Sequence, residues 1–209
     1  MKTTSTIIFL GIILFISLFI AQKFTNLDFW WMMSGNIILL LSVVFIFDKE
    51  WKAEIGKDIN DRLIYKIGVG LLSALILYVV FYIGNYVSRW MFTFAGENIN
   101  NVYSFKEGAS PVRIVLLMLL IIGPGEELFW RAFVQRKLQN NMSKWKGFVL
   151  GSLIYTLVHV ASGNVMLVLA AGICGFFWGY LYYRTNSILL NVVSHTIWDL
   201  GIFVLLPVN

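Results

Sequence analysis

Seven long apolar stretches, separated by shorter polar segments, dominate the pattern of the chain. A helix needs roughly 20 mostly apolar residues to cross the hydrocarbon core of a bilayer. We therefore predict an all-α fold, a polytopic transmembrane helix bundle with about seven spans. The predicted spans are residues 6–22, 30–47, 67–87, 112–138, 147–162, 165–183 and 188–206.

The first stretch raises the question of a signal peptide, because Lys2 precedes a long apolar run. The sequence "FIAQK" offers no A-x-A cleavage site and the run is long for a signal, so we interpret it as an uncleaved anchor. Residues 48–66 and 88–111 have room for short helices at the membrane surface. The stretch "WKAEIGKDINDRLIYK" has helical spacing and mixed charge, which suits a cytoplasmic membrane surface.

The composition agrees with a membrane protein. Of the 209 residues, 59% are hydrophobic and 13% are charged, and the mean hydropathy is +0.79. A soluble domain is nearer half apolar and about a quarter charged. The net charge of +5 does not indicate nucleic acid, because the basic residues fall between spans or at their ends. We expect membrane lipids as partners and no nucleic acid.

The basic residues also predict the topology. With a cytoplasmic N-terminus, eleven of the 16 lysines and arginines lie in cytoplasmic segments or span ends, and four lie outside. This asymmetry indicates a multi-pass protein of the bacterial plasma membrane, with its N-terminus in the cytoplasm and its C-terminus outside. The four outer residues are Lys23, Arg89, Lys106 and Arg113.

The fourth span is overlong. At 1.5 Å per residue it would measure about 40 Å, against a hydrocarbon core of about 30 Å. Gly123, Pro124 and Gly125 lie near its middle, and they predict a break or kink there. A helix that restarts at Pro124 would place Glu126 and Glu127 in its first turn, where the helix dipole favours anions.

Six ionisable side chains lie inside the spans, where such groups are costly and indicate function. They occur on three separate spans. Glu126, His159 and Asp199 lie about 17–18 Å from the cytoplasmic span ends, and His195 lies at about 11 Å. This shared depth predicts one polar site, reached from the cytoplasmic half of the membrane. The six residues are Glu126, Glu127, Arg131, His159, His195 and Asp199.

Helical spacing predicts how these residues pair. Glu127 and Arg131 are four residues apart and can form an ion pair on one face. Glu126 is rotated by about 100° and is left to interact with other helices. His195 and Asp199 are also four apart, so Asp199 can accept the imidazole N–H and fix its tautomer, or turn its oxygens to a ligand. Ser194 adjoins His195 and points elsewhere on the helix, so we interpret it as a packing residue.

Three kinds of chemistry fit such a cluster. Glu126 can act as general base on a water molecule. Glu126, His159, His195 and Asp199 together resemble a zinc ligand set. A transporter can use the same groups to relay protons, although the chain shows no internal symmetry and no second broken helix. The sequence contains neither H-E-x-x-H nor G-x-S-x-G.

Three motifs together resemble those of the CPBP intramembrane proteases. This group contains the type II CAAX prenyl endopeptidases and Abi-like bacterial proteins for bacteriocin processing and self-immunity. "EELFWR" resembles the E-E-x-x-x-R motif, and "YTLVH" resembles an aromatic followed four residues later by histidine. "HTIWD" resembles the last motif, histidine followed four residues later by Asn or Asp.

The resemblance divides the chain into N-terminal transmembrane helices and surface segments, residues 1–111, and a CPBP-like catalytic core, residues 112–209. It implies hydrolysis of a peptide bond in a peptide or lipidated-protein substrate. Glu126 would activate water, with His159 positioning it. His195 and Asp199 would stabilise the oxyanion or complete a metal site that holds a divalent ion such as zinc. Glu127 and Arg131 would hold the first helix in place.

Aspartate at position 199 bears on these roles, because a deprotonated carboxylate cannot donate a hydrogen bond whereas asparagine can. Asp199 therefore favours a metal, or the orientation of His195, over direct donation to an oxyanion. A non-proteolytic membrane scaffold or bacteriocin self-immunity protein is the alternative to a protease. In that case the polar cluster would only lock the bundle.

Overall fold

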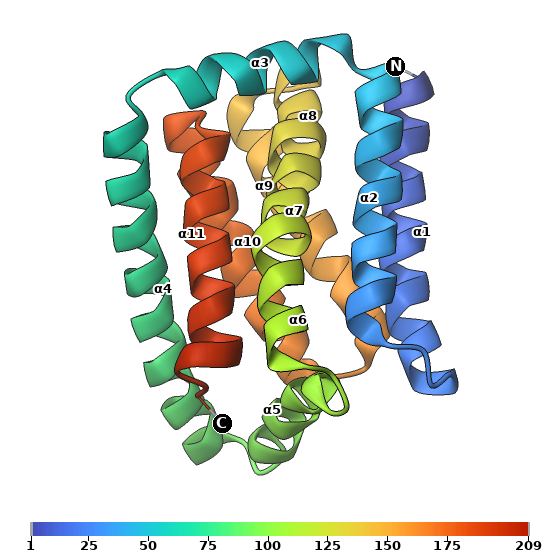
Figure 1. Cartoon of the computed structure of the whole chain (residues 1–209), viewed down its shortest axis with the longest axis vertical. Coiled ribbons are helices and arrows are strands. Elements are labelled where there is room, and N and C mark those ends of the chain that lie inside the picture. Colours follow the sequence, from blue (N-terminus) through green and yellow to red (C-terminus); the bar gives the residue numbers. More distant parts are fainter. Residues whose placement is uncertain (1, 209) are drawn as a thin grey trace.

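Long helices run through the whole length of the molecule, and two shorter helices lie across its opposite ends (Figure 1). The computed structural model describes residues 2–208, and these residues form helices and no strand. The helices are α1 (Lys2–Phe24), α2 (Phe29–Phe47), α3 (Lys49–Asn60), α4 (Leu63–Met91), α5 (Ala95–Tyr103), η1 (Ser104–Lys106), α6 (Pro111–Leu117), η2 (Met118–Ile122), α7 (Gly123–Phe129), η3 (Trp130–Gln135), α8 (Arg136–Asn141), α9 (Lys144–Val158), η4 (His159–Ser162), α10 (Val165–Thr185), α11 (Ile188–Leu200) and η5 (Gly201–Leu205).

Five of the described helices are long and apolar enough to cross a membrane. They present large apolar side chains to their surroundings, for example Phe9, Leu72 and Ile83, each more than half exposed. Such side chains suit contact with lipid, where a helix also satisfies its own backbone hydrogen bonds. The predicted transmembrane helix bundle is confirmed. The five helices are Lys2–Phe24, Phe29–Phe47, Leu63–Met91, Val165–Thr185 and Ile188–Leu205.

The other two predicted spans are present as composite helices, each interrupted by a change of helix type. One runs from α6 through η2, α7 and η3 to α8, and the other is α9 continued by η4. Of the break or kink expected at Gly123 to Gly125, the break is not found, because the backbone stays helical throughout. Instead, π-helical turns occur before and after α7, at η2 and η3. Such turns shift the hydrogen-bond ladder and commonly accompany helix bends, so they accommodate the missing N–H of Pro124.

The two glycines beside Pro124 allow α7 to approach its neighbours closely. A Cβ added at Gly123 would lie 2.4 Å from Thr196 Oγ1 on α11. A Cβ added at Gly125 would lie 2.2 Å from Ile37 Cγ2 on α2. The two glycines therefore allow close packing between helices. From the sequence they are interpreted as part of a helix break.

The helix α3 lies across one end of the bundle and is fixed there by buried polar contacts (Figure 1). Asp48, at its start, forms an ion pair with Arg136 of α8. Asp58, near its end, accepts hydrogen bonds from the Ser187 hydroxyl (3.2 Å) and the Leu189 N–H (2.8 Å) at the start of α11. The predicted surface helix is present, and it covers this end of the molecule.

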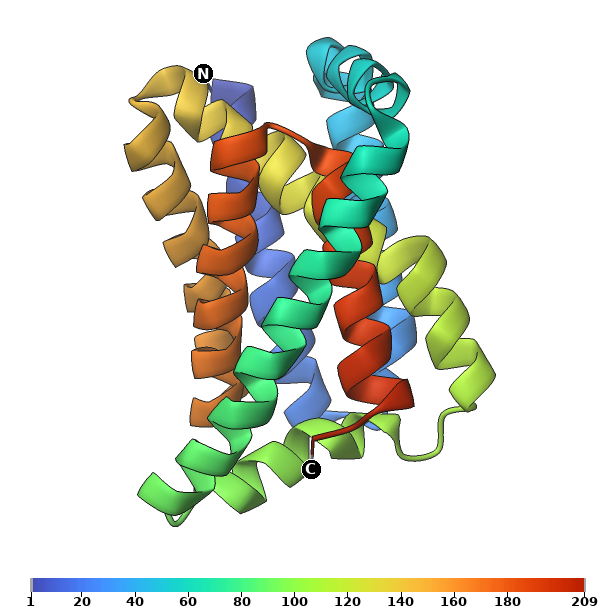
Figure 2. The ribbon, with the colours of Figure 1, turned by 90° about the vertical axis from the view of Figure 1, so that its left-hand side faces the viewer.

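The short helix α5 lies at the other end, beside the last residues of the chain (Figure 2). The Tyr103 hydroxyl donates to the Ile202 carbonyl at 2.9 Å and accepts from the Val208 N–H at 3.1 Å. The Asn164 side chain, at the start of α10, donates to the Asn98 carbonyl at 2.7 Å. Because α1 begins at the α3 end and η5 lies at the α5 end, the two ends of the chain are on opposite sides. Which side is cytoplasmic stays a prediction, as does the division at residue 111.

Candidate active site

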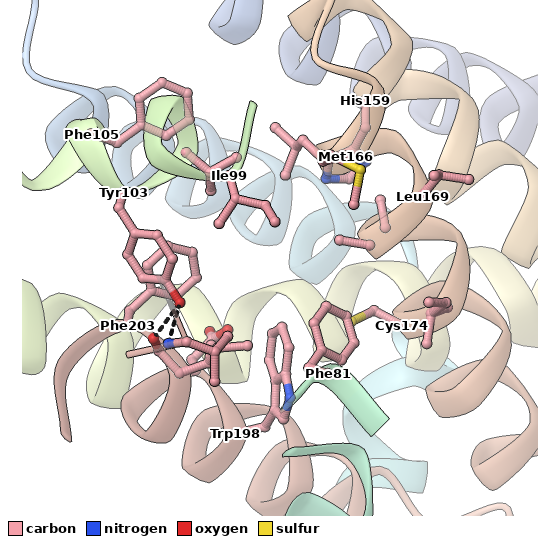
Figure 3. Close-up of a pocket in the computed structure, with 18 of the residues that line it drawn as sticks. Phe81, Ile99, Tyr103, Phe105, His159, Met166, Leu169, Cys174, Trp198 and Phe203 are labelled. Carbon is pink, nitrogen blue, oxygen red and sulfur yellow. Dashed lines mark hydrogen bonds between the residues drawn. The ribbon is translucent and has the colours of Figure 1, made fainter. Parts of the chain in front are cut away.

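A single buried region contains all six of the predicted site residues. Glu126, His159, His195 and Asp199 line one cavity of about 380 Å³, and each is at most 8% exposed. Glu127 and Arg131 lie buried beside it. The rest of the wall is mostly apolar and aromatic, with Phe81, Tyr103, Phe105, Trp198 and Phe203 around the space in Figure 3.

Glu127 is fully buried and fully hydrogen-bonded. Its Oε1 accepts from Arg131 Nη1 at 2.8 Å, which confirms the predicted ion pair. The same oxygen lies 2.8 Å from His195 Nδ1, and Oε2 accepts from Asn191 Nδ2 at 3.0 Å. A buried carboxylate is tolerated only when its charge and its lone pairs are satisfied in this way. Glu127 therefore joins α7, η3 and α11, rather than holding one helix alone.

His195 takes its orientation from Glu127 and not from Asp199. Its Nδ1 lies against an oxygen of the Glu127 carboxylate. An ionised carboxylate accepts hydrogen bonds and has no proton to donate, so Nδ1 is the donor. Its Nε2 lies 3.6 Å from Asp199 Oδ2, beyond hydrogen-bond distance. The proton on Nδ1 is thus held by a residue 68 positions away in the sequence, while Nε2 is turned toward Asp199.

Trp178 of α10 fixes the plane of the His195 ring. The two rings are stacked, with centroids 3.6 Å apart and an interplanar angle of 21°. The indole N–H donates to the Ser194 hydroxyl at 3.1 Å, and Asn191 Nδ2 also donates to the Trp178 carbonyl at 2.8 Å. Ser194 therefore anchors the stacked indole, beyond the packing role that the sequence suggested.

Sequence reasoning missed Asn191 and Trp178. Asn191 is an uncharged amide inside an apolar span, four residues before His195, and this spacing is the signal that points to it. Trp178 carries no comparable signal, because aromatic residues are common throughout the spans. Its role depends on the contact between α10 and α11.

Glu126 faces the cavity without a protein partner. Its Oε2 is buried and makes no hydrogen bond to any residue that the structure describes. The prediction that Glu126 turns away from Arg131 is consistent with this geometry. A buried polar atom without a partner is rare and needs an explanation, of which an interacting water or substrate group is one.

His159 also presents one free nitrogen. Its Nδ1 lies 2.8 Å from the Tyr155 carbonyl oxygen, which can only accept, so the proton is on Nδ1. The ring is held between Phe19 and Tyr155, at centroid distances of 5.2 Å and 4.9 Å. Its Nε2 is therefore an acceptor that is available to a molecule in the cavity.

The elements that line the cavity show toward which end of the bundle it extends. Beyond the site residues and their helices, its wall includes the end of α1, the start of α2, the second half of α4, α5, η1, η2 and η5. Neither α3 nor α8 contributes to it. The cavity therefore extends from the site residues toward the α5 end, whereas α3 lies across the other end and its ion pairs hold it there. Access from the cytoplasmic half of the membrane stays a prediction.

The four predicted metal ligands do not form a metal site in this arrangement. A zinc site gathers three or four ligand atoms around one point. Within residues 2–208, no group of three or more His, Cys, Asp or Glu side chains is placed to hold a metal ion. Glu126, His159, His195 and Asp199 share a cavity wall but do not converge on one point, so no step below passes through a metal.

The structure is an all-helical membrane bundle with buried carboxylates and imidazoles around an apolar cavity. Residues 108–201 match a family model described as type II CAAX prenyl endopeptidase Rce1-like. This match to a model of CAAX-type endopeptidases confirms the CPBP resemblance. All three motifs lie inside the match. Comparison with curated proteins and with solved structures gives no match.

Proposed function

We propose that the protein is an endopeptidase of the plasma membrane, and that Glu126 is the general base that activates water. The observation that carries this assignment is the unpartnered Glu126 carboxylate in the cavity wall. The family match supports a protease, and the burial of the site supports hydrolysis within the membrane. The substrate would be a peptide or a lipidated protein.

In this proposal Glu126 takes a proton from a water molecule as the oxygen attacks the peptide carbonyl. His159 Nε2, an acceptor, binds the second hydrogen of the same water. The C–N bond then breaks, and protonated Glu126 gives its proton to the leaving amine. Atoms and charges balance, and the carboxylate is regenerated for the next turnover.

His195 would stabilise the oxyanion that forms on the carbonyl. Protonated at both nitrogens, it keeps Nδ1–H on Glu127 and offers Nε2–H to the oxyanion. Glu127, which also pairs with Arg131, supports the imidazolium charge at 2.8 Å. Asp199, 3.6 Å from Nε2, adds to this support without occupying the donor.

Cleavage of defined peptides tests this function. Purified protein in liposomes is given prenylated and leader-type peptides, with the products identified by mass spectrometry in water enriched in ¹⁸O. The proposal predicts an internal cut and one ¹⁸O in the new carboxylate, and Glu107→Gln, an exposed change, retains the activity. If the folded protein cleaves none of the peptides, this result contradicts the proposed protease function.

The alternative of a scaffold or bacteriocin self-immunity protein rests on one specific observation. The contacts of Glu127 with Arg131, His195 and Asn191 would lock three helix segments together without any reaction. If the whole polar cluster only locks the bundle in this way, Glu126→Ala and His159→Ala also unfold the protein. The protease predicts folded, inactive variants, so a thermal unfolding measurement separates the two.

A further inference from the structure

The cavity reaches its surroundings through the half of the molecule that contains α5. From the buried carboxylates it passes Phe81 and Gly84 of α4 and Ile99 and Tyr103 of α5 (Figure 3). At the α3 end the helix seals the bundle: the Trp51 indole donates to the Leu128 carbonyl at 3.1 Å, one residue beyond Glu127. A substrate therefore approaches from the α5 end.

The cavity also opens sideways. Val80 of α4 and Leu169 and Ile173 of α10 line it, yet each of the three is more than 40% exposed. The helix α4 packs against α11, and these exposed side chains of α4 and α10 lie on either side of the cavity. An apolar segment of a membrane-bound chain fits this opening.

The charges at the two ends of the bundle differ strongly. The α3 end holds most of the basic residues, whereas the α5 end has only the four that the sequence places there. Lysine and arginine accumulate on the cytoplasmic side of membrane proteins. The α3 end is therefore the cytoplasmic end by this rule, and the cavity opens into the opposite, outer half of the bilayer.

We infer that this protein receives its substrate from the outer side of the membrane. The substrate class is a peptide with an uncharged, apolar segment lying in the outer half of the bilayer. A peptide that is made in the cytoplasm reaches this place only after transport, so translocation across the membrane precedes the cut. The cleavage itself rests on the proposed function, but the direction of access does not.

Cysteine labelling tests the direction of access. Single cysteines are introduced after Cys174→Ala, which removes the only native cysteine. Gly84→Cys lies in the cavity wall and Gly56→Cys lies on α3, and a Cβ at either glycine meets no atom within 4 Å. Glu107→Cys marks the exposed surface beyond η1. Intact cells are treated with a charged, membrane-impermeant maleimide, before and after permeabilisation.

The inference predicts labelling of Gly84→Cys and Glu107→Cys in intact cells, and of Gly56→Cys only after permeabilisation. Labelling of Gly56→Cys in intact cells, with the other two protected, overturns it. Labelling of Gly84→Cys only after permeabilisation also overturns it.

A sided cleavage assay separates this inference from the proposed function. A peptide that the wild type cleaves is added to right-side-out and to inside-out membrane vesicles. Cleavage in right-side-out vesicles alone is the expected result. Cleavage in inside-out vesicles alone contradicts outer access while the protease stands. If Gly84→Cys is labelled in intact cells but neither vesicle preparation cleaves the peptide, the proposed protease function is contradicted and access from the outer side is supported.

Discussion

Glu127 Oε1 lies 2.8 Å from His195 Nδ1, although the two residues are 68 positions apart and lie on different helices. Both side chains are at most 3% exposed. This contact makes the second glutamate of the E-E pair part of the histidine's environment. It also explains why the two neighbouring glutamates differ: Glu127 is saturated with partners, whereas Glu126 has none on its inner oxygen.

A double-mutant cycle tests this contact. We expect Glu127→Gln to lower kcat at least about 100-fold, because the amide no longer supports a charged imidazole. His195→Gln should cost a similar amount, and the double variant should lose little more than the larger single loss. The measurement is kcat/KM for the three variants on one peptide. Additive losses would show that the two residues act independently.

The stacked Trp178 provides a second prediction, in which a series of variants separates the ring from its N–H group. Trp178→Leu removes the ring and should lower kcat about 100-fold with KM unchanged, since small misplacements of a reacting group have effects of this size. Ser194→Ala removes the hydrogen bond of 3.1 Å and keeps the indole, whereas Trp178→Phe removes that bond and keeps a smaller aromatic ring; each should cost less than about tenfold.

A spectroscopic readout distinguishes positioning from general packing. In ¹⁵N spectra, Trp178→Leu should shift the His195 ring signals and leave those of His159, whose Nδ1 is held by the Tyr155 carbonyl. Equal changes at both histidines would indicate a loss of structure and contradict the positioning role.

The close packing of Gly123 against α11 predicts a change in stability. Gly123→Ala should reduce the free energy of unfolding by about 1–3 kcal/mol, because the new methyl group clashes with Thr196. Gly68→Ala is the control, since a Cβ there meets nothing within 4 Å. Thermal unfolding in detergent gives both values. Equal midpoints for the two variants would contradict the packing account.

The arrangement of the four predicted metal ligands gives a prediction about metal content. Because they do not converge on one point, we expect no stoichiometric zinc in purified protein and no loss of cleavage after treatment with a chelator. Elemental analysis of wild type and His159→Ala, beside activity with and without the chelator, provides the check. Loss of activity that added zinc restores would contradict this arrangement.

The sequence predicts those features that depend on local periodicity. The apolar spans follow from their length, and the Glu127–Arg131 pair follows from a spacing of one helical turn. The isolation of Glu126 from its neighbour follows from the rotation between adjacent helical residues. These properties are set within one helix, so one segment of sequence contains them.

The remaining features depend on contacts between helices that are far apart in the chain. Asp199 is the local candidate to bind His195, but the packing of α7 against α11 brings Glu127 to Nδ1 instead. The direction of the cavity depends on α3 and α5 lying across opposite ends, and a list of span depths contains no such information. Pro124 between two glycines is equally consistent with a helix break and with close packing, and the neighbouring helices decide between them.

The most direct test of the central claim is the turnover number of Glu126→Gln. The variant keeps the size of the side chain and removes the base, so the account predicts a folded protein that binds peptide with an unchanged KM. Its kcat should fall at least about 100-fold. A folded Glu126→Gln variant that cleaves the peptide at the wild-type rate would contradict the assignment of Glu126 as the general base.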